Sequence, residues 1–251
     1  MAARGEHRYL FIGGLHKSGT SVLFKILRDH PAISGFRETG VPEDEGQFLQ
    51  SVFLPARAYG GPGVFGFHPE AHLTEASPLV TAENRTRLFA EWSRYWDLRR
   101  PVLLEKSPPN LIRTRFLQAM VPDAFFIILV RHPIPVALAT RRWSTATLPA
   151  LIEHWLVCHE TYAADRPHIR RLLEIRYEEF IADPEALLAQ VYAFIDLPPQ
   201  PARRKVASDL NDRYLAEWRN IRETPEGEEA IRAIQERFAD RIARWGYRVE
   251  A

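Results

Sequence analysis

The feature that most constrains the fold is a short apolar run followed by a glycine-bearing loop and a helical pattern. The run spans Tyr9 to Ile12, and the helical pattern covers Thr20 to Arg28. Such a strand, loop and helix bring backbone N–H groups and the positive end of a helix dipole to one point. The order therefore predicts an α/β protein with an anion site in the loop Gly13-Gly14-Leu15-His16-Lys17-Ser18-Gly19-Thr20-Ser21.

Apolar strands and helical patterns continue to alternate along the chain. Residues 33–80 are irregular and long enough to be a functional insertion. The alternation predicts a three-layer αβα fold with a central, mostly parallel sheet. Further strands are predicted at Pro101 to Lys106, Ala124 to Arg131 and Leu172 to Tyr177, and helices at Thr81 to Asp97, Asn110 to Met120, after His132-Pro133, from Asp183-Pro184 to Phe194 and at Glu226 to Trp245.

Length and charge exclude several classes of function. A chain of 251 residues is at the upper edge of what one core supports, so we expect one domain over residues 1–251. Lys and Arg number 33 against 32 for Asp and Glu, so no cationic field indicates a nucleic-acid or membrane-surface binder. The single Cys158 fits a reducing compartment, and no apolar stretch resembles a signal peptide or a membrane span. These observations predict a cytoplasmic protein, and they leave its oligomeric state open.

The loop nearly matches the Walker A pattern of nucleotide-binding proteins. Gly14 and Gly19 have the right spacing, but Thr20 stands where that pattern has lysine, and the lysine lies inside the loop as Lys17. The acidic residue with which P-loop NTPases bind Mg²⁺ at the end of a strand is also absent, because Arg131 occupies that place. An arginine there favours an anion over a metal, so we expect a P-loop-like fold with no metal site.

Three ordered segments together resemble the PAPS-dependent sulfotransferase family, in particular bacterial members related to the tyrosylprotein and heparan sulfotransferases. The resemblance implies transfer of a sulfuryl group from PAPS, 3′-phosphoadenosine 5′-phosphosulfate, to a hydroxyl or an amine, without a metal. The acceptor would be a small molecule, a glycan, a lipid or a peptide. The segments are GGLHKSGTS at 13–21, LLEKSPPNLIRTRFLQAMVPDAFFIILVRHP at 103–133 and IRYEEFIADPEALL at 175–188.

The resemblance also implies which residues bind the donor. Arg131 matches the arginine that holds the 3′-phosphate, and Tyr177 matches a position near the adenine ring. The family's serine eight residues after the arginine is Ala139 here, so Thr140 or Ser144 would have to replace it. The residues implied for the 5′-phosphosulfate are Lys17, Ser18, Gly19, Thr20 and Ser21, with His16 beside them.

Sulfuryl transfer needs a general base that takes the proton of the acceptor. The relatives place a catalytic glutamate shortly after a His-Pro pair that follows the first helix, and the spacing from His30-Pro31 indicates Glu38. A small insertion would shift the match to Glu43 or Glu45. His16 is a further candidate, because imidazole titrates near neutral pH, although it could instead only shape the loop.

Two lysines are the candidates for stabilising the charge of the leaving phosphate. Lys17 lies in the loop, and Lys106 ends a strand where tyrosylprotein-type relatives keep a second catalytic lysine. Two alternatives stay open, a P-loop nucleotide or small-molecule kinase and a non-catalytic nucleotide-binding protein. The missing Walker residues count against the kinase. The retention of Lys17, Glu38, Lys106 and Arg131 counts against the non-catalytic protein.

Overall fold

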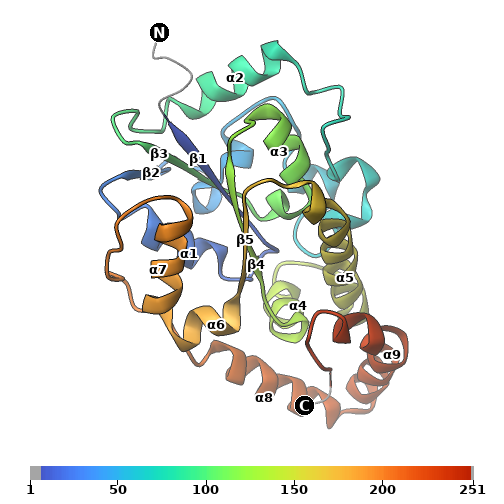
Figure 1. Cartoon of the computed structure of the whole chain (residues 1–251). Helices are drawn as coiled ribbons and strands as arrows, with labels where there is room; N and C mark the ends of the chain where they lie inside the picture. The colour runs from blue at the N-terminus through green and yellow to red at the C-terminus, as the bar shows by residue number, and fades with distance from the viewer. Residues whose placement is uncertain (1–6, 250–251) are drawn as a thin grey trace.

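A computed structural model of the chain describes residues 7–249, and its centre is a sheet of five parallel strands (Figure 1). The order of the strands is β2-β3-β1-β4-β5, so the first strand of the chain is the middle one. The strands are β1 (Arg8–Gly13), β2 (Ile33–Gly35), β3 (Val102–Lys106), β4 (Phe125–Val130) and β5 (Leu172–Arg176).

Helices cover both faces of this sheet, as predicted for an α/β fold. Figure 1 shows α1, α6 and α7 on one side and α4, α5 and α9 on the other. Every residue of β3 and β4 is buried, which explains why β4 is continuously apolar and why β3 is apolar up to Glu105 and Lys106. The helices are α1 (Thr20–Leu27), α2 (Ala82–Trp92), α3 (Thr114–Met120), α4 (Pro133–Arg141), α5 (Leu148–Asp165), α6 (Tyr177–Ala182), α7 (Pro184–Phe194), α8 (Leu210–Arg222) and α9 (Pro225–Ala243).

The register brings the carboxyl ends of the strands to one edge of the sheet. Ile12 of β1 lies opposite Lys106 of β3, and Gly13 lies opposite Ile128 of β4. From β1 the chain continues to β2 and β3 on one side of it. It then crosses to β4 and β5 on the other side. Crevices at such a reversal of strand order are the usual ligand sites of open α/β sheets. The loop at residues 13–21 and Lys106 therefore lie at this edge.

The structure departs from the predicted elements in three places. The segment predicted to be irregular contains β2, which has only three residues, and several short 3₁₀ helices. The helix predicted from Asn110 to Met120 is a 3₁₀ turn, Pro108–Ile112, followed by α3. The two elements are separate because Arg113 has a φ of −132°, outside the helical region. Helices α6 and α8 were not predicted.

Within residues 7–249, no helix combines the length and the hydropathy that a membrane span requires.

Candidate active site

The loop between β1 and α1, residues 13–21, has backbone conformations that favour glycine. Gly14 and Gly19 have φ values of 141° and 97°, and Lys17 has a φ of 71°. A Cβ atom on Gly19 would lie 2.6 Å from the ring of Tyr177, so this position accepts no side chain. The guanidinium of Arg131 donates a 2.6 Å hydrogen bond from Nη1 to the carbonyl of Lys17, which holds the left-handed turn.

A cavity of about 380 Å³ opens beside this loop. Its walls come from the loop and the start of α1, from the acidic segment after β2, from the end of α4 and from α8. The predicted site residues that line it are His16, Lys17, Gly19, Thr20, Ser21, Glu43, Glu45, Arg131 and Tyr177.

Lys17 is half-buried at the mouth of this cavity. Its ammonium lies 3.2 Å from the centroid of the Trp143 ring, a cation–π contact with an exposed indole. Burial lowers the pKa of Lys17, and the charge of Arg142 lowers it further, while Glu43 opposes both effects. The Lys17 side chain is thus a cation that lines the cavity.

Arg131 is a buried cation that faces the same cavity. Its Nε donates to Asn211 Oδ1 at 2.8 Å, and its carbon Cζ lies 4.2 Å from the centroid of the Tyr177 ring. The remaining nitrogen, Nη2, has no hydrogen-bond partner among the described residues. Burial lowers the pKa of Arg131, although Tyr177 and Glu178 oppose that effect. A buried guanidinium with a free N–H group is suited to binding a phosphate.

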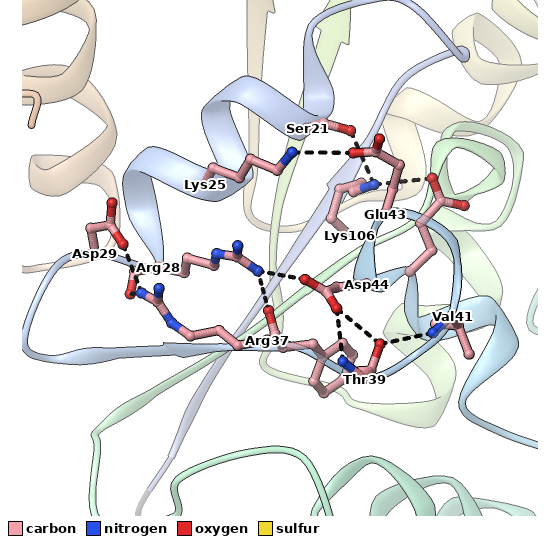
Figure 2. Close-up of polar contacts among 12 residues, drawn as sticks. Ser21, Lys25, Arg28, Asp29, Arg37, Thr39, Val41, Glu43, Asp44 and Lys106 are labelled. Carbon is pink, nitrogen blue, oxygen red and sulfur yellow. Dashed lines mark hydrogen bonds and ion pairs between the residues drawn. The ribbon is translucent and has the colours of Figure 1, made fainter. Parts of the chain in front are cut away.

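Lys106 and Glu45 form a buried ion pair, of which Glu45 is the partner that lines the cavity. The Lys106 Nζ lies 3.0 Å from Glu45 Oε1. It also donates to Ser21 Oγ at 3.2 Å (Figure 2). The second carboxylate oxygen of Glu45 accepts a 2.5 Å hydrogen bond from the Gln47 amide. This pair therefore connects the end of β3, the first turn of α1 and the acidic segment.

The acidic segment is fixed to the sheet by Glu105, the residue before Lys106. Its Oε1 accepts hydrogen bonds from the Gly46 backbone at 3.0 Å and from Ser107 Oγ at 2.6 Å. Its Oε2 accepts one from the Asn110 amide at 2.6 Å. Burial raises the pKa of Glu105 to about 7, while Ser107, Asn110 and Lys106 oppose the rise. Strand β3 thereby sets the position of Glu45.

The predicted glutamates occupy different places. Glu38 is exposed and is not one of the described residues that line the cavity. Glu43 lies at the cavity, 3.4 Å from Lys25 Nζ, and Figure 2 shows this lysine reaching it from α1. Burial would raise the pKa of Glu43, but the charges of Lys25 and Lys106 outweigh that effect and lower it.

The spacing along the sequence indicated Glu38, but the structure brings Glu45 to Lys106. The reason is the local conformation of the backbone. Glu38, Glu43 and Asp44 all have a φ near 50°, so the backbone turns back on itself there. Asp44 stabilises the first of these turns by accepting hydrogen bonds from the Thr39 N–H and hydroxyl groups. Spacing counted along the sequence does not include such turns.

Thr140 does not line the large cavity as predicted, whereas His16 lines both that cavity and a smaller space. Ala139 lines the large cavity, whereas Thr140 faces a space of only about 10 Å³ that His16, Gly63 and His154 also line. Successive residues of a helix point about 100° apart, so the neighbour of residue 139 cannot replace its side chain. Burial lowers the pKa of His16 to about 3, and the charges of His154, Lys106 and Lys17 lower it too.

Sequence reasoning missed Gln47 and Glu105. Glu105 carried a signal, because it is a charged residue inside an otherwise apolar strand. Gln47 carried none, since it reaches the site from a segment without a motif. Within residues 7–249, no group of three or more His, Cys, Asp or Glu side chains is placed to hold a metal ion.

The sequence also matches a family of known proteins. The family model described as "Sulfotransferase family" matches residues 10–201, more than half of the chain. No curated protein sequence matches the chain significantly.

Several solved structures share the fold. The sulfotransferase domain of the Synechococcus PCC 7002 olefin synthase has a TM-score of 0.55 and 18% identity, over 86% of this chain and 91% of that chain. The sulfotransferase domain of the curacin biosynthetic pathway has a TM-score of 0.52 and 14% identity, over 91% and 98%. Sulfotransferase STF1 of Mycobacterium tuberculosis H37Rv has a TM-score of 0.50 and 17% identity, over 93% and 77%. The TM-scores and the coverage show that this chain shares the fold of these structures.

Proposed function

Because the chain belongs to the sulfotransferase family, we propose that it transfers a sulfuryl group from PAPS to a hydroxyl or an amine of an acceptor. The observation that carries the choice of donor is Arg131, whose buried Nη2 lacks a partner beside the cavity that the phosphate loop also lines. PAPS has a phosphosulfate on the 5′ side of its ribose and a phosphate on the 3′ side. It therefore needs two anion sites, and the loop and Arg131 supply two.

The loop and the amino end of α1 would bind the phosphosulfate. When bound, PAPS supplies the sulfuryl group, and adenosine 3′,5′-bisphosphate is the second product. The N–H groups at the start of α1 and the ammonium of Lys17 would stabilise the charge that develops on the leaving phosphate oxygen. Arg131 would bind the 3′-phosphate, with the Tyr177 ring beside it.

We assign the general base to Glu45. This carboxylate lies at the cavity and is held between Lys106 and the Gln47 amide. It would take the proton of the acceptor as the new bond from oxygen or nitrogen to sulfur forms and the bond from sulfur to phosphate breaks. Burial lowers the pKa of His16 to about 3, so its imidazole has little affinity for a proton.

The test is titration calorimetry with adenosine 3′,5′-bisphosphate and, separately, with ATP and Mg²⁺. The wild type should bind the bisphosphate, and Arg131→Ala should weaken that binding by at least tenfold, the loss expected when a charged hydrogen bond to phosphate is removed. Arg94→Ala is a control, because Arg94 is exposed and does not line the cavity.

Two results would contradict the proposal. Metal-dependent binding of ATP without any binding of the bisphosphate would favour the kinase. Bisphosphate binding without transfer to any acceptor, and with an affinity that Lys17→Ala does not change, would favour the non-catalytic protein.

A further inference from the structure

Helix α8 covers one side of the donor cavity, although it follows the range that the family model matches. Leu210 and Tyr214 of this helix line the cavity, and α8 packs against α4 and α9. In Figure 1, α8 runs below α4 and α6, near the carboxyl ends of the strands. A helix in this position can act on the donor site.

Asn211 of α8 stands between two opposite charges. Its Oδ1 accepts a 2.8 Å hydrogen bond from Arg131 Nε, and its Nδ2 donates a 3.0 Å hydrogen bond to Glu178 Oε1. The amide is only 8% exposed, so both contacts are made away from water. Because one end of an amide only accepts and the other only donates, this orientation is fixed by the two charges.

Glu178 is satisfied without Arg131. Its Oε1 also accepts from the His132 backbone N–H at 3.1 Å, and its Oε2 accepts from the Tyr247 hydroxyl at 2.9 Å. A guanidinium next to a carboxylate would ordinarily form a direct bidentate pair, and its charge would then be compensated. The Asn211 amide occupies that place instead, and the Arg131 Nη2 stays without a partner among the described residues.

The same region lacks the hydroxyl expected from α4. Ala139 is the residue that faces the cavity at that position, and it offers no hydrogen bond. The orientation of Arg131 thus determines how well a 3′-phosphate is held.

We propose that Asn211 is a positioning residue that separates Arg131 from Glu178 and so keeps Arg131 available for the 3′-phosphate of the donor. This inference rests on the proposed function, since it assumes a 3′-phosphorylated donor. It makes α8 a determinant of the preference for nucleotides with that phosphate.

The experiment compares the dissociation constants of adenosine 3′,5′-bisphosphate and adenosine 5′-monophosphate, measured by titration calorimetry on the full chain. The dissociation constant of the monophosphate divided by that of the bisphosphate isolates the contribution of the 3′-phosphate. Asn211→Ala should lower the ratio by about tenfold or more, the scale of one charge-assisted hydrogen bond, with the monophosphate affinity unchanged. Asn220→Ala is the matched control, because Asn220 is an exposed residue of the same helix.

Asn211→Ser guards against a variant that fails to fold. It keeps a small polar side chain on α8 but is too short to bridge Arg131 and Glu178, and thermal unfolding checks its integrity. Arg131 should then pair with Glu178 directly, so the ratio should again fall by about tenfold or more.

The outcomes separate the inference from the proposed function. A wild type that prefers the bisphosphate, with variants that keep the wild-type ratio, would overturn the role of Asn211 alone. Equal losses of affinity for both nucleotides would also overturn it, because they would indicate a merely structural role. A wild type without any preference would overturn the donor assignment and the inference with it.

Discussion

The buried ion pair between Lys106 and Glu45 can be tested by removing one partner. The two side chains are 0% and 8% exposed, and their charged atoms are 3.0 Å apart. Lys106→Met keeps most of the volume but leaves the Glu45 carboxylate buried without its ammonium. Such a change costs about 3–5 kcal/mol of the free energy of unfolding. For a chain of this length that loss lowers the Tm by roughly 6–20 °C.

The double variant Lys106→Met/Glu45→Gln separates stability from chemistry. A neutral pair is often as stable as a buried ion pair, so most of the lost free energy should return. Sulfuryl transfer should not return, because the proposed base and the cation beside it are both gone. Chemical denaturation of the wild type, the two single variants and the double variant gives the coupling energy directly.

A matched control is available nearby. Lys25→Met removes one partner of the exposed pair with Glu43, and its cost should stay below about 1 kcal/mol. A cost this small for Lys106→Met, or a double variant no more stable than Lys106→Met, would refute the reasoning.

Three further predictions concern the same edge of the sheet. Glu45→Gln should slow transfer by about 10²–10⁴-fold without changing bisphosphate affinity, whereas Glu38→Gln should be neutral in the same assay; the reverse result would return the base to Glu38. Gly19→Ala should lower the free energy of unfolding by about 1–3 kcal/mol in denaturant, because it adds a side chain at a φ of 97° and against Tyr177, and wild-type stability would show that the loop can yield. Glu105 has a pKa raised from 4.5 to about 7 in the folded protein, so its contribution to stability is fully present below pH 4.5 and decreases as the pH rises to about 7, by about 3 kcal/mol. Glu105→Gln should lack this slope in unfolding measurements across that range, and an equal slope in both proteins would assign it to other groups.

The elements that lie in one continuous segment were predicted from the sequence. The order of strand, glycine-bearing loop and helix in residues 9–28 was correct, and so was the strand that leads into Arg131. The sulfotransferase family was also predicted correctly. These features depend on local backbone preferences and on apolar runs, which a single sequence displays.

The parts that depend on tertiary contacts could not be predicted in this way. Strand β2 has three residues, too few for a periodic pattern. Glu45 reaches Lys106 because of two left-handed turns and because Glu105 holds the next residue of the segment. Asn211 contacts Arg131 across 80 residues of chain. No spacing rule includes such a contact.

The contact between Lys17 and Trp143 gives the protein an optical reporter of its own. Trp143 is 61% exposed, and the ammonium lies on the face of its indole. Four of the other tryptophans, Trp92, Trp96, Trp155 and Trp218, are buried and emit at shorter wavelengths. An anion that draws the lysine toward the loop takes this charge away from the Trp143 ring. The long-wavelength part of the tryptophan emission should therefore change when the loop is occupied, without any label. Rapid mixing with a nucleotide would then give the rate of binding.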